Sequence, residues 1–410
     1  MGRDRNILHN EERFLLHKIQ SLLAQTPQNK VKFKSVITCK KIPVATISPF
    51  YHPNAGYVPV VRRLQRADFL NLIECNNTFL CPHCAYRILN KHARIIQGII
   101  DGARRENYVG IMYVLTVPHY KYESSEQVLN KLCGTWATFK RHGSFKRKWK
   151  QIAQEIGHVT SLETTYGVNG WHHHYHILAF VPKSQLETIR TNWSLFREHW
   201  AKSYEKNSCT YDYPVWQSEY NRMAGYEADP YNVGASLSTN KDGSIRIATV
   251  SEYVTGWSSA AEIAKGNDKL HESVSKIPFE LADGTPEEQQ LFLEYADSVF
   301  RKRQRISYTP KLQRRFAEDI AAKHAEAEKK TAEACGKQDT TIAYISYKTW
   351  NDILQAEDEL DEPIRELILI NAFRRGITGI REILLEFSIA DPEVYEEIPT
   401  ISINYDCILG

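Results

Sequence analysis

The feature that most constrains the fold of this chain is a predicted β-hairpin at residues 158–181, whose second strand carries four histidines. The first strand reads HVTSLETTYG, the turn chemistry comes from Val168-Asn169-Gly170, and the return strand reads WHHHYHILAFV. The histidines lead directly into an apolar run, which favours a buried strand over a solvated loop. The hairpin therefore predicts an antiparallel sheet with several buried imidazoles.

Alternation along the strand predicts a metal site on one face of this hairpin. His172, His174 and His176 share a face, because successive strand residues point to opposite sides. A turn centred near Asn169 brings Glu163 opposite the histidine strand, roughly level with His174 and His176. One carboxylate and two imidazoles make an open site for Mg²⁺ or Mn²⁺. The alternative is a hydrogen-bonded ladder of histidines at a sheet edge.

The stretch from Glu163 to His176 resembles the metal-binding motif of HUH endonucleases, in which U is a bulky hydrophobic residue. Specifically, it is similar to the replication initiator proteins of rolling-circle plasmids, where a glutamate strand precedes Gly-Trp-His-Pro-His-x-His. The resemblance implies that His174 and His176 are the metal-binding pair, with Tyr175 as U and His172 as an accessory or spare ligand.

Two further segments fit the same pattern. Residues 113–117 (YVLTV) resemble the early strand that lies beside the histidine strand, and residues 196–202 (FREHWAK) resemble the helix that follows it. His173 stands where the family often has proline. The similarity spans about residues 39–312 and fades afterwards.

The resemblance implies an α+β fold with an HUH-type nuclease core, in which helices cover a central antiparallel sheet. A small zinc-binding segment precedes this core, and a mostly helical C-terminal region follows it. The expected segments are an N-terminal helix with the zinc-binding segment at 1–106, the nuclease domain at 107–312, a helical linker at 313–339 and an acidic C-terminal module at 340–410.

HUH enzymes cut single-stranded DNA with a tyrosine near the metal, and Tyr253 is the expected nucleophile here. Residues 251–257 (SEYVTGW) resemble the family segment around that tyrosine. Attack on the phosphorus would leave a 5′-phosphotyrosine and a free 3′-OH. Glu252 is the candidate for activating water at termination. Tyr253 as a packed helix residue is the alternative, and the next candidates for the nucleophile are Tyr220, Tyr226 and Tyr231.

Four cysteines have the spacing of a structural zinc site. Cys81 and Cys84 form a C-x-x-C pair, Cys75 lies six residues before it, and Cys39 is the best candidate for the fourth thiolate. Either His83 or His92 could replace Cys39, and incidental burial of the cysteines is the alternative. Eight cysteines without a secretory signal fit a reducing cytosol, so we expect a cytoplasmic protein.

The net charge of +3 hides an asymmetry along the chain. From Thr340 onward there are 14 acidic and 5 basic residues, which leaves the preceding residues strongly basic. A basic body suits a polyanion, and the acidic tail is expected to be dispensable for DNA cleavage. Basic residues beside aromatic ones suit single-stranded DNA, although charged helix faces are common. The candidate DNA-binding residues are Lys146, Arg147, Lys148, Trp149, Arg303 and Arg305.

The expected function is that of a rolling-circle replication initiator, which nicks single-stranded origin DNA and later rejoins the ends. Its expected partners are single-stranded or supercoiled origin DNA and a host helicase and polymerase, because the chain has no G-x-x-x-x-G-K-[ST] loop. No apolar run approaches the roughly 20 residues of a membrane span, so no membrane partner is expected.

Three other functions remain open. A single-strand transposase of the zinc-plus-HUH type tends to carry a tyrosine pair, and a relaxase usually offers a third histidine further along the strand. Neither feature is seen in this sequence. The third alternative belongs to another class, namely a zinc-containing, sequence-specific DNA-binding protein without catalysis.

Overall fold

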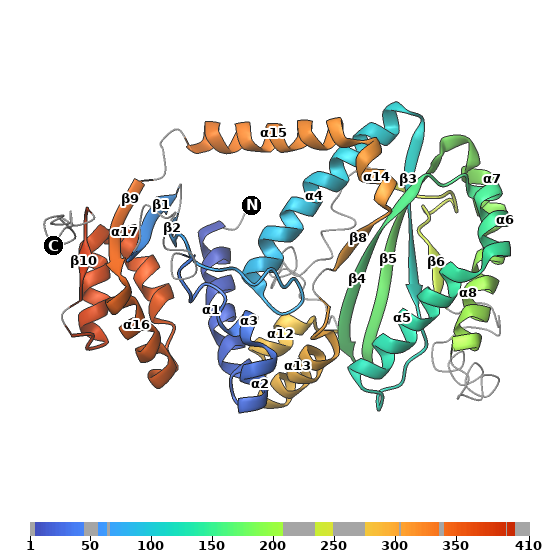
Figure 1. The fold of residues 1–410 in the computed structure, drawn as a ribbon. Helices are drawn as coiled ribbons and strands as arrows, with labels where there is room; N and C mark the ends of the chain where they lie inside the picture. Colours follow the sequence, from blue (N-terminus) through green and yellow to red (C-terminus); the bar gives the residue numbers. More distant parts are fainter. Residues whose placement is uncertain are drawn as a thin grey trace, which may run out of the picture. The chain divides into compact units, whose positions relative to one another are not determined.

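The computed structural model describes residues 5–44, 56–63, 66–207, 234–248, 275–302, 305–335, 340–390 and 392–397 (Figure 1). The chain divides into two compact units, one formed by residues 1–75 with 329–410 and the other by residues 76–328. This division differs from the predicted segments, because the region from residue 340 shares a unit with the start of the chain.

The unit at residues 76–328 is built around an antiparallel sheet with the strand order β6-β3-β5-β4-β8, and β7 also pairs with β3. The strands are β3 (Tyr108–Thr116), β4 (Gly157–Gly167), β5 (Gly170–Pro182), β6 (Ala235–Leu237), β7 (Ile247–Ala248) and β8 (Ile306–Tyr308). The predicted hairpin is confirmed as β4 and β5, which pair from Gly157↔Phe180 to Gly167↔Gly170.

The turn of this hairpin depends on Gly170. Its φ of +83° lies in the left-handed region, which favours glycine. A Cβ at this position would also stand 2.8 Å from the Cα of Lys121. The β4–β5 turn is therefore packed tightly against the loop that follows β3.

Helices cover both faces of the sheet (Figure 1). On one face, α5 (Ser125–Arg141) packs against β5, with Cys133 Sγ 3.4 Å from the hydroxyl of Tyr175. On the other face, His92 of α4 (Pro82–Arg105) stacks on Tyr308 of β8. Tyr308 pairs with Val159 and so shares a face with Glu163. The remaining helical segments of this unit are α6 (Gly143–Ala153), η3 (Lys183–Gln185), α7 (Leu186–Thr191), α8 (Trp193–Asn207), α12 (Pro278–Asp283), α13 (Pro286–Val299) and α14 (Pro310–Arg315), and α15 (Ala317–Cys335) begins in it.

The unit at residues 1–75 with 329–410 has a second antiparallel sheet, in the order β10-β9-β1-β2. Its elements are α1 (Arg5–Leu23), α2 (Pro27–Lys32), α3 (Lys34–Ile37), β1 (Tyr57–Arg63), β2 (Arg66–Phe69), β9 (Thr340–Ser346), α16 (Tyr347–Leu360), α17 (Ile364–Glu386) and β10 (Val394–Tyr395). Strand β9 pairs with β1 from Tyr57↔Ser346 to Arg62↔Thr340.

The predicted acidic module at 340–410 is thus not an independent unit. Among the described residues after 339, strand β9 pairs only with the two-residue β10, so it needs β1 to complete its backbone hydrogen bonds. Trp350 of α16 is fully buried, packs on Phe69 of β2 and donates a hydrogen bond to the carbonyl of Lys41. The two ends of the chain therefore share one hydrophobic core.

The predicted α+β class with a central antiparallel sheet is confirmed. Among the helices of the described residues, none combines the length and apolar character needed to cross a membrane.

Candidate metal centres

The register of β4 and β5 brings three predicted ligands together. Glu163 is directly opposite His174, and His176 lies two residues further along the same face. All three side chains are buried, with exposed fractions of 7% for Glu163 and His174 and 4% for His176. The ligand atoms of these residues form a group that could hold a metal ion.

The distances within this triad fit a divalent cation. Glu163 Oε2 lies 3.0 Å from His174 Nε2 and 2.6 Å from His176 Nε2, and the two Nε2 atoms are 3.0 Å apart. Adjacent ligands in an octahedral site with bonds of about 2.1 Å lie about 3.0 Å from each other. A cation held between the three atoms would take the place of the hydrogen bonds that they make in its absence.

The electrostatics of Glu163 keep its carboxylate ionised. Burial by itself raises the pKa of Glu163, but hydrogen bonds from the two imidazoles outweigh that effect and bring the pKa to about 2. The Nδ1 atom of His174 is buried and has no hydrogen-bond partner among the described residues. Because the pKa of Glu163 is this low, its carboxylate is ionised at neutral pH and can bind a cation.

His172 lies beside the triad and is not part of the ligand group. His119 Nδ1 is 3.1 Å from the carbonyl of Asn169, and His119 Nε2 is 2.9 Å from His172 Nδ1. A carbonyl only accepts, so His119 donates through Nδ1 and accepts through Nε2. His172 then donates through Nδ1, which leaves its Nε2 as an acceptor. The hydrogen bond from His172 to His119 fixes this ring beside the triad, and its role as an accessory or spare ligand stays a prediction.

His173 faces the opposite side of the sheet, and the sequence analysis assigned it no role. Its Nδ1 lies 2.8 Å from Thr164 Oγ1 and its Nε2 lies 3.1 Å from Ser125 Oγ at the start of α5. Burial lowers the pKa of His173 to about 3, so the ring is neutral. Strand alternation already places residue 173 on the face opposite to residues 172, 174 and 176, so the sequence does carry the signal for this orientation.

The four predicted cysteines come together as a second candidate centre. The sulfur atoms of Cys39, Cys75, Cys81 and Cys84 all lie within 4.8 Å of one another. A tetrahedral zinc site with Zn–S bonds of about 2.3 Å has sulfurs about 3.8 Å apart, which is within this limit. His92 is engaged elsewhere, because its Nδ1 is 2.6 Å from the hydroxyl of Tyr308.

Backbone N–H groups already point at two of these sulfurs. Cys75 N–H donates to Cys39 Sγ, and Cys84 N–H donates to Cys81 Sγ, each at 3.4 Å. Cys81 is also the N-cap of α4, so its side chain satisfies one of the open N–H groups of the first turn. Such N–H···S bonds stabilise thiolates, the form that binds zinc.

The predicted catalytic residues fall outside the part of the chain that the structure describes. Tyr253 and Glu252 lie outside the described residues, as do Tyr220, Tyr226 and Tyr231. Arg303 lies outside them as well.

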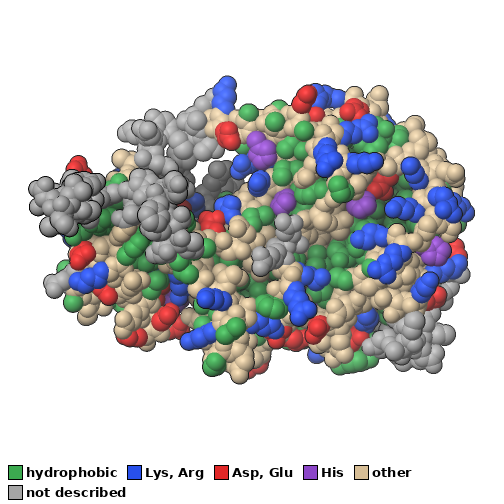
Figure 2. All heavy atoms as spheres, viewed as in Figure 1, with side chains coloured by type: hydrophobic (Ala, Val, Ile, Leu, Met, Phe, Trp, Pro, Cys, Tyr) green, Lys and Arg blue, Asp and Glu red, His purple; other side chains and the backbone are tan. Residues whose placement is uncertain are grey.

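Two predicted DNA-binding residues pack against aromatic rings of the protein itself. Trp149 is buried, and its ring packs on Phe196 of α8, because the apolar side of α6 faces the core. Arg305 lies over the rings of Phe79 and Phe279. By contrast, Lys146, Arg147 and Lys148 are exposed on α6, and Figure 2 shows basic side chains gathered over the region of α5, α6 and α8.

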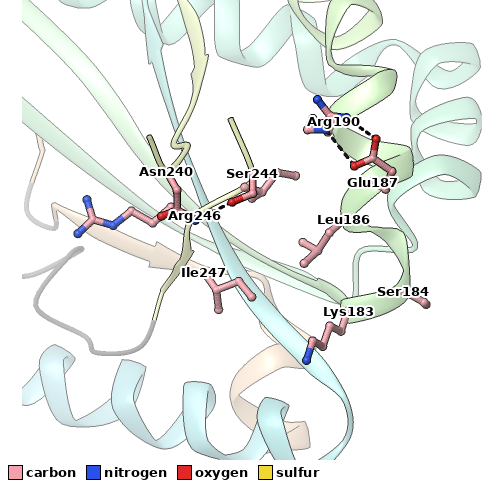
Figure 3. A pocket seen from close by; sticks show the side chains of 10 residues that line it. Lys183, Ser184, Leu186, Glu187, Arg190, Asn240, Ser244, Arg246 and Ile247 are labelled. Atoms are coloured by element: carbon pink, nitrogen blue, oxygen red, sulfur yellow. Dashed lines mark hydrogen bonds and ion pairs between the residues drawn. The ribbon is translucent and has the colours of Figure 1, made fainter. Parts of the chain in front are cut away.

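A pocket of about 660 Å³ lies beyond the far end of β5 (Figure 3). Lys183, Leu186 and Arg190 line it together with the segment from Asn240 to Ile247. Arg190 is paired there with Glu187 and is not directed at a common centre with the other cations. Lys183 is seven residues from His176, or about 23 Å along a strand, so this pocket is separate from the metal triad.

Comparisons with protein-family models, with curated proteins and with solved structures find no match for this chain.

Proposed function

We propose that this chain is a metal-dependent, single-strand DNA endonuclease of the HUH type that acts as a rolling-circle replication initiator. The observation that carries the proposal is the buried triad of Glu163, His174 and His176, whose three ligand atoms lie 2.6–3.0 Å apart on neighbouring strands. The order of the motif residues, one carboxylate strand followed by a hairpin turn and an H-U-H strand, supports this class over other metal sites.

The triad would hold Mg²⁺ or Mn²⁺, and the bound ion would withdraw charge from the scissile phosphate. Glu163 supplies the one formal negative charge of the ligand set, and its depressed pKa keeps that charge at neutral pH. His174 and His176 supply neutral donors and leave coordination positions for phosphate oxygens. The four-cysteine centre would hold a structural zinc ion.

Tyr253 is the proposed nucleophile. Its phenol oxygen would form a bond to phosphorus as the bond from phosphorus to the 3′ oxygen breaks, and the released 3′ oxygen would take up a proton. The DNA fragment downstream of the nick would remain attached through its 5′ phosphate as a phosphotyrosine. At termination the 3′-OH would attack that ester and restore the strand. Alternatively, a water molecule would attack it, and Glu252 is the candidate to activate that water.

The test is a covalent adduct with single-stranded DNA. A pool of 3′-end-labelled oligonucleotides with a randomised centre would be incubated with the protein and Mn²⁺ and separated on a denaturing gel. We expect a labelled protein band that disappears with EDTA, with Tyr253→Phe and with Glu163→Gln. Tyr231→Phe serves as the matched control and should still form the adduct.

The four-cysteine centre also favours a second function, that of a zinc-containing DNA-binding protein without catalysis. Such a protein would retain oligonucleotides in a native gel and give no covalent band in any metal. The same experiment therefore separates the two functions, since only the endonuclease forms a bond that survives denaturation.

A further inference from the structure

A stacked aromatic pair, of which one ring is exposed, lies in the loop between β3 and α5, which we call the tyrosine loop (residues 117–124). The rings of Tyr120 and Tyr122 are stacked, with centroids 5.2 Å apart and planes only 9° from parallel. Tyr122 is nevertheless 80% exposed. The stack covers one face of the Tyr122 ring, so its outer face is open to solvent, an unfavourable state for so large an apolar surface.

The tyrosine loop is held by contacts that have nothing to do with these two rings. Glu123 is buried, accepts a hydrogen bond from the backbone N–H of Tyr120 and pairs with Lys131 at 2.5 Å. Lys131 also donates to the carbonyl of Pro118 at 3.0 Å. Since the loop is fixed at several points, ordering Tyr122 for a ligand would cost little conformational entropy.

The loop also lies directly beside the metal triad. The backbone of Lys121 packs against Gly170, two residues before His172. His119 hydrogen-bonds His172, and the ring centroids of His172 and His174 are 4.7 Å apart. A group bound on Tyr122 would therefore lie close to the metal ligands, because the loop that carries Tyr122 contacts the strand that carries His174 and His176.

We propose that Tyr120 and Tyr122 form a stacking platform for one base of single-stranded DNA, placed next to the nucleotide that the metal triad would cleave. The proposal rests on the proposed function and specifies how its substrate is held. An unpaired base has two open π faces and can stack on the outer face of Tyr122, whereas bases inside a duplex are already stacked. Lys121, exposed between the two tyrosines, is suitably placed to contact the adjoining phosphate.

The platform is tested by binding of an oligothymidylate of about 20 nucleotides, which is longer than the sites of most single-strand binding modules. Fluorescence anisotropy would measure the affinity in the presence of EDTA, so that neither metal nor nucleophile is needed. Tyr122→Ala should weaken binding about fivefold or more, because stacking contributes 1–3 kcal/mol per base. Tyr122→Phe keeps the ring and should bind like the wild type. Leu385→Ala, which removes another exposed apolar side chain from the other unit, is the matched control and should have no effect.

A second arm uses an abasic oligonucleotide of the same length. Here the wild type and Tyr122→Ala should bind equally, because no base is present to stack. Equal binding of both proteins to oligothymidylate would overturn the platform while leaving the proposed endonuclease intact. No binding of oligothymidylate by the wild type would count against both. Loss of the covalent adduct in Tyr122→Phe would also overturn the platform, since it would make Tyr122 a nucleophile.

Discussion

Neighbouring histidines on β5 face three different partners. His174 converges with Glu163, His173 bonds Thr164 and the start of α5, and His172 is held by His119. Strand alternation explains the split between His173 and the other two. It does not distinguish His172 from His174, because both face the same side and only the position of Glu163 selects one as a ligand.

The neutral, fully buried ring of His173 predicts a pH dependence of stability. Burial lowers its pKa from 6.5 to about 3. Between these values the unfolded chain binds one more proton than the folded chain, so stability falls as pH falls through this window. At pH 5 the loss from this residue should be about 2 kcal/mol.

Denaturant unfolding across this pH range measures that loss. His173→Gln has no titrating group at the position, so its free energy of unfolding should fall less steeply on acidification than that of the wild type. Identical pH profiles for the two proteins would show that His173 is protonated equally in both states.

At the scale of single elements, the sequence predicted the hairpin and the helices better than the faces they bury. The β4–β5 hairpin was predictable because strand alternation, a turn and an apolar run agree. The burial of Trp149 was not, since α6 is basic around most of its surface and only contact with Phe196 of α8 reveals which side is covered. The contacts of Arg305 with Phe79 and Phe279 were not predictable for a similar reason, because these rings are distant from it in the sequence.

Helix α6 should separate DNA binding from stability. Replacing Lys146, Arg147 and Lys148 together by alanine should weaken single-stranded DNA binding and reduce the slope of log K against log salt by about 2. Trp149→Ala should instead lower the free energy of unfolding by about 3–5 kcal/mol. An unchanged salt slope in the triple variant would show that this surface does not contact DNA.

The start of α4 should depend on zinc. Cys81→Ser with Cys84→Ser should remove about one equivalent of zinc and lower the melting temperature by about 5 °C or more, because metal binding free energy is also folding free energy. Cys133→Ser, a cysteine outside the cluster, is the control and should keep its zinc. A zinc-free wild type by elemental analysis would refute the assignment.

At the scale of the whole chain, the sequence did not predict that residues near the two ends fold together. The acidic composition after Thr340 favoured a separate module, yet β9 pairs with β1 and Trp350 packs on Phe69. The amino-acid composition of such a region mainly reflects its solvent-facing residues and does not show which strands pair. Strand partners nearly 300 residues apart leave no local signal, because each strand is consistent with several pairings.

This arrangement predicts the effect of ending the chain at residue 339. The truncated chain would lose β9, α16 and α17, and the core residues Val60 and Phe69 would lose their cover. Limited proteolysis should then cut rapidly within β1 and β2, which should resist cleavage in the full-length protein. Equal resistance in the two proteins would mean that the first 75 residues fold without the C-terminal region, as the sequence analysis expected.

The most direct test of the central claim is the position of a bound manganese ion. Crystals of the full-length protein grown with MnCl₂ should show an anomalous peak about 2 Å from Glu163 Oε2, His174 Nε2 and His176 Nε2 at once. Manganese bound elsewhere, with these three side chains still hydrogen-bonded to one another, would contradict the assignment of the triad as the metal centre.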